Sequence, residues 1–592
     1  MNRKFALIFL LAIGFSALLA GYRIPSVHAI IWVEGHITSD TTWSPVDTYR
    51  VIDNTYVDPG VTLTILPGVH VQVADGFSLV VDGNLNATGT SLNPIVFTSS
   101  RVAQNPPNPY PGAWNTIRFQ GNSSCEFKLE NAKIEYAIHG VTVNSLGATM
   151  IEKSEILDCS ENGVFLVSES NVVVRENTLQ HNKNGIGTYL FSEITSGVAI
   201  VNNQVQSNLE NGIYIYSYNG IISNITISSN TVSYNGEHGV YLYSKAGTGD
   251  DAYISNVTIS LNAISFNGKN GIYLNAASEA GWYWYTYVSN SIISSNAVSY
   301  NGENGISVNS QSGWRDNSYI VNATFSSNKV FSNDKNGIYI GAGGTKSSYD
   351  CLVWNNTVSA NLDKGMLIQG RPKVNITGNS FSYNSYGIVC SESQNSLASH
   401  NDIYDNTYGM NVASGATVNA EYNYWGDSTG PYHPSLNPEG KGNPVNGNGV
   451  DLDFIPFLTS PQGQINQRPV AALSVDKHTI NINETVIFDA TNSTDDGRID
   501  YYFFDFGDGT NSSWTSLPVV THKYALNGTY YATVTVMDDY GVTSTNAELI
   551  KVQIIVVPEF PSPLILLIFM IITLLAVVIY RKKTVNMHLG SY

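Results

Sequence analysis

Charged side chains are scarce in this sequence. Asp, Glu, Lys and Arg make up 13% of its 592 residues, about half of the usual share of about 25%. The formal net charge is −18, so the basic surface that nucleic-acid binding requires is missing, and nucleic acid is not an expected partner. Apolar residues almost never recur at the spacing of an amphipathic helix, whereas Gly, Asn, Ser and Tyr are abundant. This composition indicates an exported, all-β protein.

Cysteine is equally scarce. The four cysteines, Cys125, Cys159, Cys351 and Cys390, are too few and too scattered for a disulfide framework or a cysteine metal site. Cys390 occupies a position of the repeat described below at which the other copies have an apolar residue. We therefore expect it to be a small buried hydrophobic side chain. No metal site and no cofactor is expected from these residues.

The two ends of the chain predict its location. Two basic residues, an apolar run over 5–20 and small residues before position 30 predict a signal peptide over residues 1–29. Residues 564–580 are apolar or neutral, near the short limit for a membrane-spanning helix. The basic residues that open the segment 581–592 place that tail in the cytoplasm. We expect a membrane-anchored protein whose bulk lies outside the cell.

The segment before this helix, 556–563, contains Pro558-Glu559-Phe560-Pro561. It resembles the Pro-Glu-Phe sorting signal of archaeal surface proteins (PEF-CTERM), which implies a sortase-like enzyme, an archaeosortase, as a processing partner. A plain anchor helix accounts for the segment equally well, because the tail after the basic residues is longer than that signal usually has.

A short phrase recurs through the middle of the chain: an Asn-Gly or similar pair, then an alternating apolar strand. One copy is Asn211-Gly212-Ile213-Tyr214-Ile215. The glycine returns every 22 to 34 residues from Gly140 to Gly409, and a period in this range predicts a solenoid. The apolar residues one and three places after the glycine form two columns that we expect to point inward, and a third column precedes the glycine. We predict three parallel sheets around one continuous core.

Polar residues fall into columns as well. Asparagine repeats in one column that begins at Asn177 and in another that begins at Asn182. Because Asn tolerates a positive φ and its amide can bond to the turns above and below, we predict structural ladders. Two residues before each glycine the charge varies in sign, for example Glu237, Lys269 and Glu303, which favours a solvated charge ladder.

Aromatic residues give the one binding hypothesis that the repeats generate. Insertions follow the repeated strand at 244–253, 275–287 and 309–319. Exposed aromatic side chains usually indicate binding, and flat rings suit the apolar faces of sugars. The alternative is that these rings cover the sheet and each other. The candidate ligand-binding residues are Tyr214, Tyr241, Tyr273 and Tyr339 on the strands, and Trp282, Trp284, Tyr285 and Trp314 in the insertions.

Catalytic residues are hard to find. A hydrolase needs paired carboxylates, and a lyase needs an acidic calcium site with a nearby base. We find no repeat column with two carboxylates on one outward face of neighbouring strands. The weak candidates lie in the insertions, where solvated charges are the simpler interpretation: Asp250, Asp251, Lys245, Arg315 and Asp316. An enzyme is therefore less expected than a binding protein.

Residues 30–139 are predicted to cap the solenoid and form its first coils, because Thr62-Leu63-Thr64-Ile65 and its surroundings resemble the opening coils of secreted right-handed parallel β-helix proteins. Residues 140–459, which close on Asn423-Tyr424-Trp425-Gly426, resemble the NosD-type β-helix family. That resemblance implies sugar-binding or sugar-hydrolysing relatives. Copper is not expected, because His139, His181, His238 and His400 are assigned to no common column.

After a linker at 460–467, residues 468–555 change character. Phe504-Asp505-Phe506-Gly507-Asp508-Gly509 and a closing strand over 528–536 resemble a PKD domain, an immunoglobulin-like β-sandwich. The resemblance implies a spacing or adhesion role. Four carboxylates of this domain could serve as calcium ligands: Asp495, Asp496, Asp505 and Asp508.

Glycosylation is expected at Asn-x-Ser/Thr sequons in an exported chain. They are Asn86, Asn122, Asn224, Asn256, Asn322, Asn355, Asn375, Asn483, Asn492, Asn511 and Asn527. The sequence as a whole predicts a right-handed parallel β-helix, a PKD sandwich and one C-terminal transmembrane helix. The first functional hypothesis is a non-enzymatic surface protein that binds glycans or other surface polymers. The alternatives are an extracellular polysaccharide lyase or glycoside hydrolase that acts through the loops inserted at 244–319, and a purely structural envelope protein.

Overall fold

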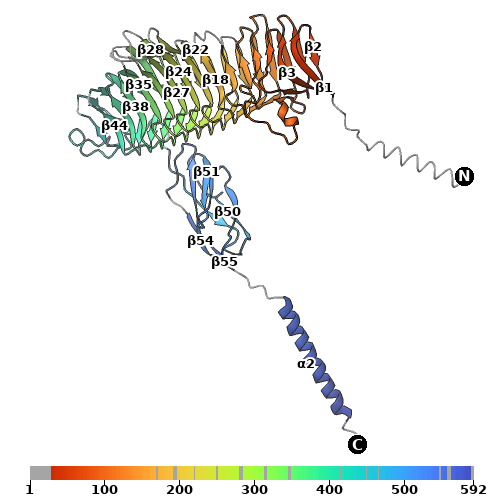
Figure 1. Ribbon diagram of the computed structural model, residues 1–592. Helices are drawn as coiled ribbons and strands as arrows, with labels where there is room; N and C mark the ends of the chain where they lie inside the picture. The colour runs from red at the N-terminus through yellow and green to blue at the C-terminus, as the bar shows by residue number, and fades with distance from the viewer. Residues whose placement is uncertain are drawn as a thin grey trace, which may run out of the picture. The chain divides into compact units, whose positions relative to one another are not determined.

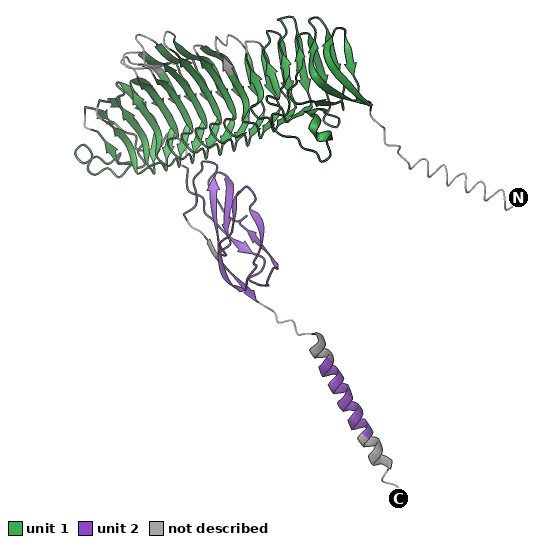
Figure 2. Ribbon diagram, in the orientation of Figure 1, with its two compact units in different colours: residues 1–464 green, residues 465–592 purple. Residues whose placement is uncertain are grey.

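The structure is a computed structural model in which two compact units can be distinguished, Met1–Gln464 and Ile465–Tyr592 (Figure 2). It describes residues 29–167, 171–190, 197–218, 221–247, 251–278, 285–311, 317–343, 348–413, 415–447, 450–463, 466–545, 548–555 and 562–588. The first unit extends from β1 (Ala29–Ile37) to β47 (Leu452–Asp453).

The first unit is a solenoid whose successive coils stack along one axis (Figure 1). Three parallel rows of strands run along it, as the repeat pattern predicted. The first row contains β21 (Ile213–Tyr218), β24 (Val240–Ala246), β27 (Ile272–Ser278), β31 (Ile306–Gln311), β35 (Ile338–Gly343) and β38 (Lys364–Gly370). The second contains β22 (Ile221–Ser228), β25 (Ala252–Ser260), β28 (Tyr285–Ser289), β29 (Ile292–Ser294), β32 (Asn317–Val321), β33 (Thr324–Ser326) and β36 (Ser348–Trp354). The third contains β23 (Thr231–Ser233), β26 (Ala263–Ser265), β30 (Ala297–Ser299), β34 (Lys329–Phe331) and β37 (Thr357–Ser359).

The register places equivalent residues of the repeat side by side. Tyr241 of β24 pairs with Tyr273 of β27, and the neighbouring inward positions pair in the same way. The three predicted inward columns are buried, for example Ile272, Leu274 and Ile264 at 0% exposure. All four cysteines are buried thiols, and burial raises the pKa of Cys390 to about 12. The predicted continuous core is confirmed.

The repeated glycine is required by the close approach of neighbouring coils. A Cβ atom on Gly271 would lie 2.4 Å from Cγ1 of Val298 and 2.7 Å from the carbonyl oxygen of Gly305. Carbon atoms do not approach this closely, so an alanine here would push two coils apart. The motif therefore needs glycine for packing rather than for a left-handed turn.

Both predicted asparagine ladders form. In the first, the backbone N–H and Nδ2 of Asn262 donate to Oδ1 of Asn296, at 3.0 and 2.9 Å. Nδ2 of Asn262 also donates to the carbonyl oxygen of Ile227, at 2.9 Å. These asparagines are almost completely buried. The side chain of Asn262 satisfies two backbone groups of the preceding coil, the N–H of Asn230 and the carbonyl oxygen of Ile227. The ladders extend one coil beyond the predicted columns, to Asn423 and Asn443.

The insertions are mostly strand, and the prediction that they are loops is wrong for the described parts. The end of β24 lies against the start of β25, and β27 and β31 contact β28 and β32 in the same way. We call these paired strand ends the fin (residues 243–246 with 252–255, 275–278 with 285–288, and 309–311 with 317–320). Its inner side chains are small and fully buried, for example Ser244, Ala276 and Thr286. Oγ1 of Thr286 lies 2.8 Å from Oγ of Ser310 across the fin.

The second unit contains a β-sandwich and a helix. One sheet consists of β48 (Ser474–Val475), β50 (Thr485–Asp489) and β53 (Val519–Lys523). The other consists of β49 (Thr479–Asn481), β55 (Glu548–Ile555), β54 (Gly528–Asp538), β51 (Ile499–Asp505) and β52 (Asn511–Thr515). Phe488, Phe504 and Tyr524 are fully buried between them. The predicted hairpin joins β51 to β52, with positive φ at Gly507 and Gly509.

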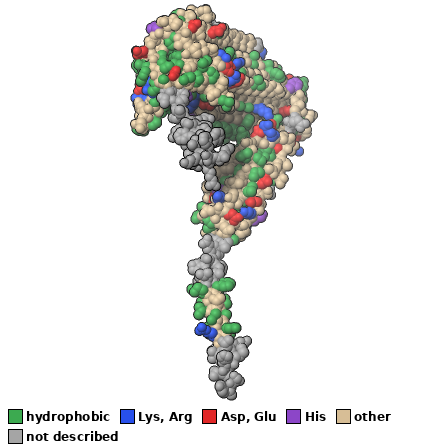
Figure 3. Space-filling view, turned by 90° about the vertical axis from the view of Figure 1, so that its right-hand side faces the viewer, with side chains coloured by type: hydrophobic (Ala, Val, Ile, Leu, Met, Phe, Trp, Pro, Cys, Tyr) green, Lys and Arg blue, Asp and Glu red, His purple; other side chains and the backbone are tan. Residues whose placement is uncertain are grey.

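The helix α2 (Ser562–His588) includes the predicted segment 564–580. Among the residues that the structure describes, no helix has the length and apolar character that a membrane crossing requires. Charged side chains are scattered among uncharged ones on the face that Figure 3 displays.

Candidate functional site

Tyrosines form a ladder on the outward face of the first row of strands. Tyr214, Tyr241 and Tyr273 occupy equivalent positions on β21, β24 and β27. The ring centroids of Tyr214 and Tyr241 lie 5.3 Å apart, and those of Tyr241 and Tyr273 lie 5.0 Å apart with an interplanar angle of 5°. The rings therefore cover one another. This arrangement is the alternative that the sequence left open, in which the rings cover each other.

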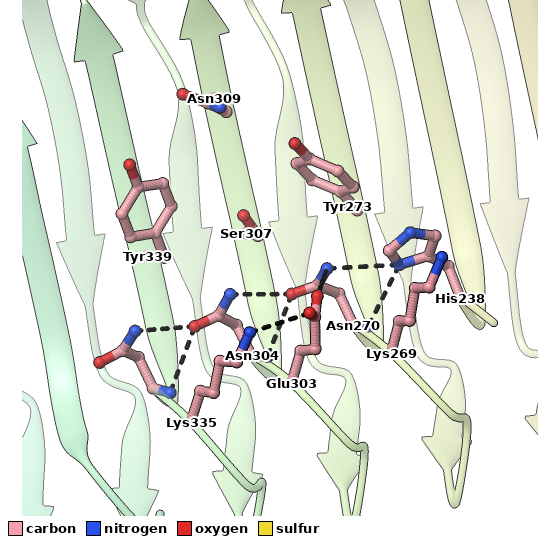
Figure 4. Close-up of a pocket in the computed structure, with 11 residues that line it drawn as sticks. His238, Lys269, Asn270, Tyr273, Glu303, Asn304, Ser307, Asn309, Lys335 and Tyr339 are labelled. Carbon is pink, nitrogen blue, oxygen red and sulfur yellow. Dashed lines mark hydrogen bonds and ion pairs between the residues drawn. The ribbon is translucent and has the colours of Figure 1, made fainter.

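The ladder is interrupted once. Ser307 of β31 occupies the next equivalent position, and Tyr339 of β35 the one after it. Figure 4 shows the rings of Tyr273 and Tyr339 on either side of Ser307. We call the space between these two rings, with Ser307 as its floor, the slot. Neighbouring strands lie about 4.8 Å apart, so the two strands that carry these rings are separated by about 9.6 Å.

The slot is the centre of an open groove of about 430 Å³. Sites for small molecules usually measure about 300 to 1,000 Å³ and combine apolar walls with a few polar groups. Here the rings of Tyr273 and Tyr339 supply the apolar sides, and the floor is polar. The lining residues are His238, Lys269, Asn270, Tyr273, Glu303, Asn304, Ser307, Asn309, Lys335, Asn336 and Tyr339.

A third polar ladder runs along one side of the groove. Nδ2 of Asn304 donates to Oδ1 of Asn270 at 2.8 Å, and Nδ2 of Asn336 donates to Oδ1 of Asn304 at 2.8 Å (Figure 4). Oδ1 of Asn336 is buried and has no hydrogen-bond partner among the described residues. His238 continues the ladder, and its Nδ1 accepts the backbone N–H of Asn270 at 3.1 Å. Burial lowers the pKa of His238 to about 4, so its imidazole is neutral.

The charges beside the slot are paired. Nζ of Lys335 lies 2.9 Å from Oε1 of Glu303, and Nζ of Lys269 lies 2.7 Å from Oε1 of Glu237. Nδ2 of Asn270 donates to Oε2 of Glu303 at 2.8 Å. The predicted charge ladder is confirmed, and in these coils it consists of Lys–Glu pairs between neighbouring coils.

The tyrosine hydroxyls stay protonated. Burial raises the pKa of Tyr273 and of Tyr339, and the side chain of Asn309 opposes this rise at Tyr273. The Tyr339 ring lies over Gly341, where a Cβ atom would come within 2.7 Å of two ring carbons. Any other residue than glycine would force Tyr339 to move.

The remaining aromatic candidates lie elsewhere. Tyr285 is on β28, in the second row of strands, where its ring lies 5.9 Å from that of Tyr287. It does not line the groove. Trp282, Trp284 and Trp314 lie outside the described residues.

The weak catalytic candidates do not assemble a site among the described residues. Asp251 accepts the Tyr253 hydroxyl at 2.8 Å and the backbone N–H of Tyr285 at 2.7 Å, so it stabilises the start of the fin strands. Lys245 is on β24, and its Nζ lies 6.0 Å from the Tyr218 ring centroid. Asp250, Arg315 and Asp316 lie outside the described residues.

One statement about carboxylates needs correction. Glu130 and Glu152 are direct neighbours on paired strands, so two carboxylates do share an outward column. Each has a cationic partner: Nζ of Lys153 lies 2.8 Å from Glu130, and Nε of Arg175 lies 2.6 Å from Glu152. Lys128, whose Nζ lies 2.7 Å from Glu130, and then Lys153 lower the pKa of Glu130, and a general acid needs a raised one. The pair therefore stabilises the sheet.

The statement about histidines also needs correction. His139 and His238 belong to one polar ladder, with three asparagines between them. Four coils separate them by about 19 Å, too far for a shared metal ion. Within the described ranges, no three His, Cys, Asp or Glu side chains are grouped to hold a metal.

The four sandwich carboxylates do not converge. Asp505 accepts the backbone N–H of Gly507, and Asp508 pairs with His522 at 2.7 Å. Asp495 instead accepts from Gly497, in another turn. Calcium binding by this domain stays a prediction.

All eleven sequon asparagines are exposed, in contrast to the buried ladder asparagines. Asn224 and Asn256 occupy equivalent positions of neighbouring coils, and Nδ2 of Asn256 lies 3.4 Å from Oδ1 of Asn224. Glycosylation itself stays a prediction.

The sequence interpretation missed Ser307, Asn309 and Glu303 as site residues. The signal was present, since Asn304-Gly305-Ile306-Ser307 is the copy in which serine replaces the tyrosine. An interruption between tyrosines is informative only once the rings are known to stack.

Comparisons with known proteins agree with this fold. The family model "Right handed beta helix region" matches residues 84–254, 196–350 and 314–431, together more than half of the chain. The model "PKD domain" matches residues 466–553.

Collagenase ColA of Clostridium perfringens (strain 13 / Type A) is 36% identical over 114 residues, 18% of this chain and 10% of the collagenase. The chain thus spans about a tenth of the length of this curated relative.

Two solved structures are similar to parts of the chain. The PKD1 domain of Vibrio anguillarum Epp is 30% identical, covers 15% of this chain and 100% of its own, and gives a TM-score of 0.13. The periplasmic alginate epimerase AlgG is 13% identical, covers 64% of this chain and 76% of its own, and gives a TM-score of 0.30. The stacked parallel strands and the family match show that the chain belongs to the right-handed β-helix family, and a PKD domain follows its solenoid in the sequence.

Proposed function

We propose that this chain is a non-catalytic surface protein that binds glycans in the slot between Tyr273 and Tyr339. The observation that carries the proposal is the single interruption of the tyrosine ladder at Ser307. A flat ring at the centre of the slot would lie about 4.8 Å from each tyrosine. That separation is within the range of about 4.5 to 7 Å at which rings stack. A pyranose carries apolar C–H groups on both faces, so it suits two such walls.

The polar groups around the slot support this choice of ligand. Asn309 and the hydroxyl of Tyr273 can donate hydrogen bonds, and Glu303 can accept them. The hydroxyl of Tyr339 donates to Oε1 of Gln369 at 3.3 Å and offers a ligand only its oxygen as an acceptor. Oδ1 of Asn336, which lines the same groove, is a buried acceptor without a described partner. Sugar hydroxyls both donate and accept, whereas a purely apolar ligand would leave these groups unsatisfied.

The alternative of a lyase or hydrolase has less support. Among the described residues that line the groove, Glu303 is the one carboxylate, and a glycosidase of the usual kind needs two. The neutral His238 accepts a backbone hydrogen bond through Nδ1. It is held as part of the ladder and is not placed to take a proton at that atom.

The surface location is part of the proposal. Export through residues 1–29, anchoring through the C-terminal segment and sortase-like processing are all predictions from the sequence. The exposure of all eleven sequons supports an exported glycoprotein, because a transferase must reach each asparagine. The NosD-type resemblance likewise remains a prediction.

The test is binding of the purified chain to a glycan array, followed by calorimetric titration of each hit. Tyr273→Ala and Tyr339→Ala should each reduce affinity about tenfold, since one stacked ring contributes about 0.5–1.5 kcal/mol beyond its buried area. Tyr214→Ala removes a ring of the same ladder away from the slot and should leave affinity unchanged. Absence of any hit, or an equal loss with Tyr214→Ala, would contradict the proposal, and release of sugar fragments would favour the enzyme.

A further inference from the structure

We infer that the slot selects an uncharged sugar and disfavours uronates and other anionic sugars. This inference rests on the proposed function and names the class of its ligand. Its basis is the pairing of every cation beside the slot with a glutamate of the neighbouring coil.

Two lysines line the groove, and neither is available to a carboxylate ligand. Nζ of Lys335 lies 2.9 Å from Glu303, and Nζ of Lys269 lies 2.7 Å from Glu237. Among the described lining residues there is no arginine and no further lysine. A ligand carboxylate would have to compete with a protein carboxylate that the lysine already contacts.

Glu303 adds a direct penalty for anions. Its carboxylate lines the groove and is held by Lys335 on one side and by Nδ2 of Asn270 on the other. A second carboxylate beside it would be a like charge in a partly desolvated place, where charges interact more strongly than in water. The neutral His238 supplies no positive charge to offset this repulsion.

An uncharged sugar meets complementary groups instead. Its hydroxyls can donate to Glu303 and accept from Asn309 and the Tyr273 hydroxyl. Nδ1 of His238 accepts from the backbone of Asn270, so its proton is on Nε2. For that Nε2–H the structure gives no acceptor within the described ranges, which leaves one more donor beside the groove.

The inference predicts a change of specificity in a charge variant. Glu303→Gln keeps a hydrogen-bond acceptor for Asn270 but releases Lys335, so the slot gains an unpaired cation. Glu237→Gln releases Lys269 in the same way and serves as an independent second variant. Glu161→Gln is the matched control, because Glu161 pairs with Lys183 at 2.9 Å in the same charge ladder and does not line the groove.

The experiment titrates the purified full chain with a galactose oligomer and with a galacturonate oligomer of the same linkage. The wild-type chain should bind the neutral oligomer at least about tenfold more tightly. Glu303→Gln and Glu237→Gln should each narrow this ratio by about tenfold, and added salt should weaken the gained galacturonate binding. Glu161→Gln should leave the ratio unchanged.

The outcomes separate the two proposals. Preference of the wild-type chain for galacturonate, or an unchanged ratio in both Glu303→Gln and Glu237→Gln, would overturn the inference while glycan binding stands. A ratio that shifts equally in Glu161→Gln would also overturn it, because the effect would then be one of overall charge. If neither these oligomers nor any glycan of the array binds, the proposed function fails, and the inference fails with it.

Discussion

Ser307→Tyr should make the solenoid more stable and abolish ligand binding. The new ring would complete the ladder between Tyr273 and Tyr339, at the register that already places the Tyr241 and Tyr273 rings 5.0 Å apart. Two new stacked pairs at about 0.5–1.5 kcal/mol each predict about 1–3 kcal/mol more unfolding free energy. The same phenol fills the slot, so affinity for any glycan should fall at least about a hundredfold.

The measurement combines denaturant unfolding with calorimetric titration of the same preparations. Leu367→Tyr is the matched control, because Leu367 pairs with Tyr339 on the side away from the slot. It adds one stacked pair, which predicts about 0.5–1.5 kcal/mol of stability, and leaves the slot open. A stable Ser307→Tyr protein that still binds would refute the assignment of the slot. A destabilised one would refute the argument that the ladder can be completed.

Three further predictions concern the solenoid. Asn262→Ala should lower the unfolding free energy by about 2–4 kcal/mol, since it leaves buried backbone groups without partners. Asn375→Ala, at an exposed position of strand β39 (Pro372–Thr377), should change it by less than about 0.5 kcal/mol in the same urea titration. Burial lowers the pKa of His238 to about 4 from its ordinary 6.5. Between these pH values the unfolded chain binds more protons than the folded chain. The unfolding free energy should therefore fall by about 3 kcal/mol as the pH drops from about 6.5 to about 4. His238→Asn should abolish that loss in unfolding curves at pH 7 and 4.5. Gly271→Ala should lower the unfolding free energy by at least about 2 kcal/mol through overpacking, and with it the melting temperature. Gly343→Ala is the control, because its Cβ would meet nothing within 4 Å, and it should leave the melting temperature unchanged.

The sequence predicted the parts of the fold that depend on repetition. Period-two alternation identified inward residues such as Ile272 and Leu274, and the column of Asn262 identified a ladder, because each copy repeats the same local choice. The insertions misled the interpretation. Their Ser and Ala residues, such as Ser244 and Ala276, lack the large apolar alternation of a typical strand, and they are buried only because two strands pack face to face in the fin.

The candidate site was only partly predictable. Tyr273 and Tyr339 were identified as ligand-binding residues because exposed flat rings suit sugars. Within the ladder the rings cover one another, so this reason holds only beside the interruption at Ser307. Ser307 was not identified, because a single serine carries no signal by itself. The ion-pair partners of Glu303 and Lys335 could not be predicted either, since charges of alternating sign in a column do not reveal which neighbours pair.

By itself the sequence determined a solenoid of three parallel sheets, its buried columns and its asparagine ladders, because those features follow from each coil having the same pattern as the next. Only the tertiary structure decided that tyrosine rings stack along the axis and that Ser307 opens a space between them. Tyr273 and Ser307 are 34 residues apart, and Ser307 and Tyr339 are 32 apart. They become neighbours only through the register of the coils, which strand pairing sets. The insertions differ in length, so the sequence spacing does not reveal this register.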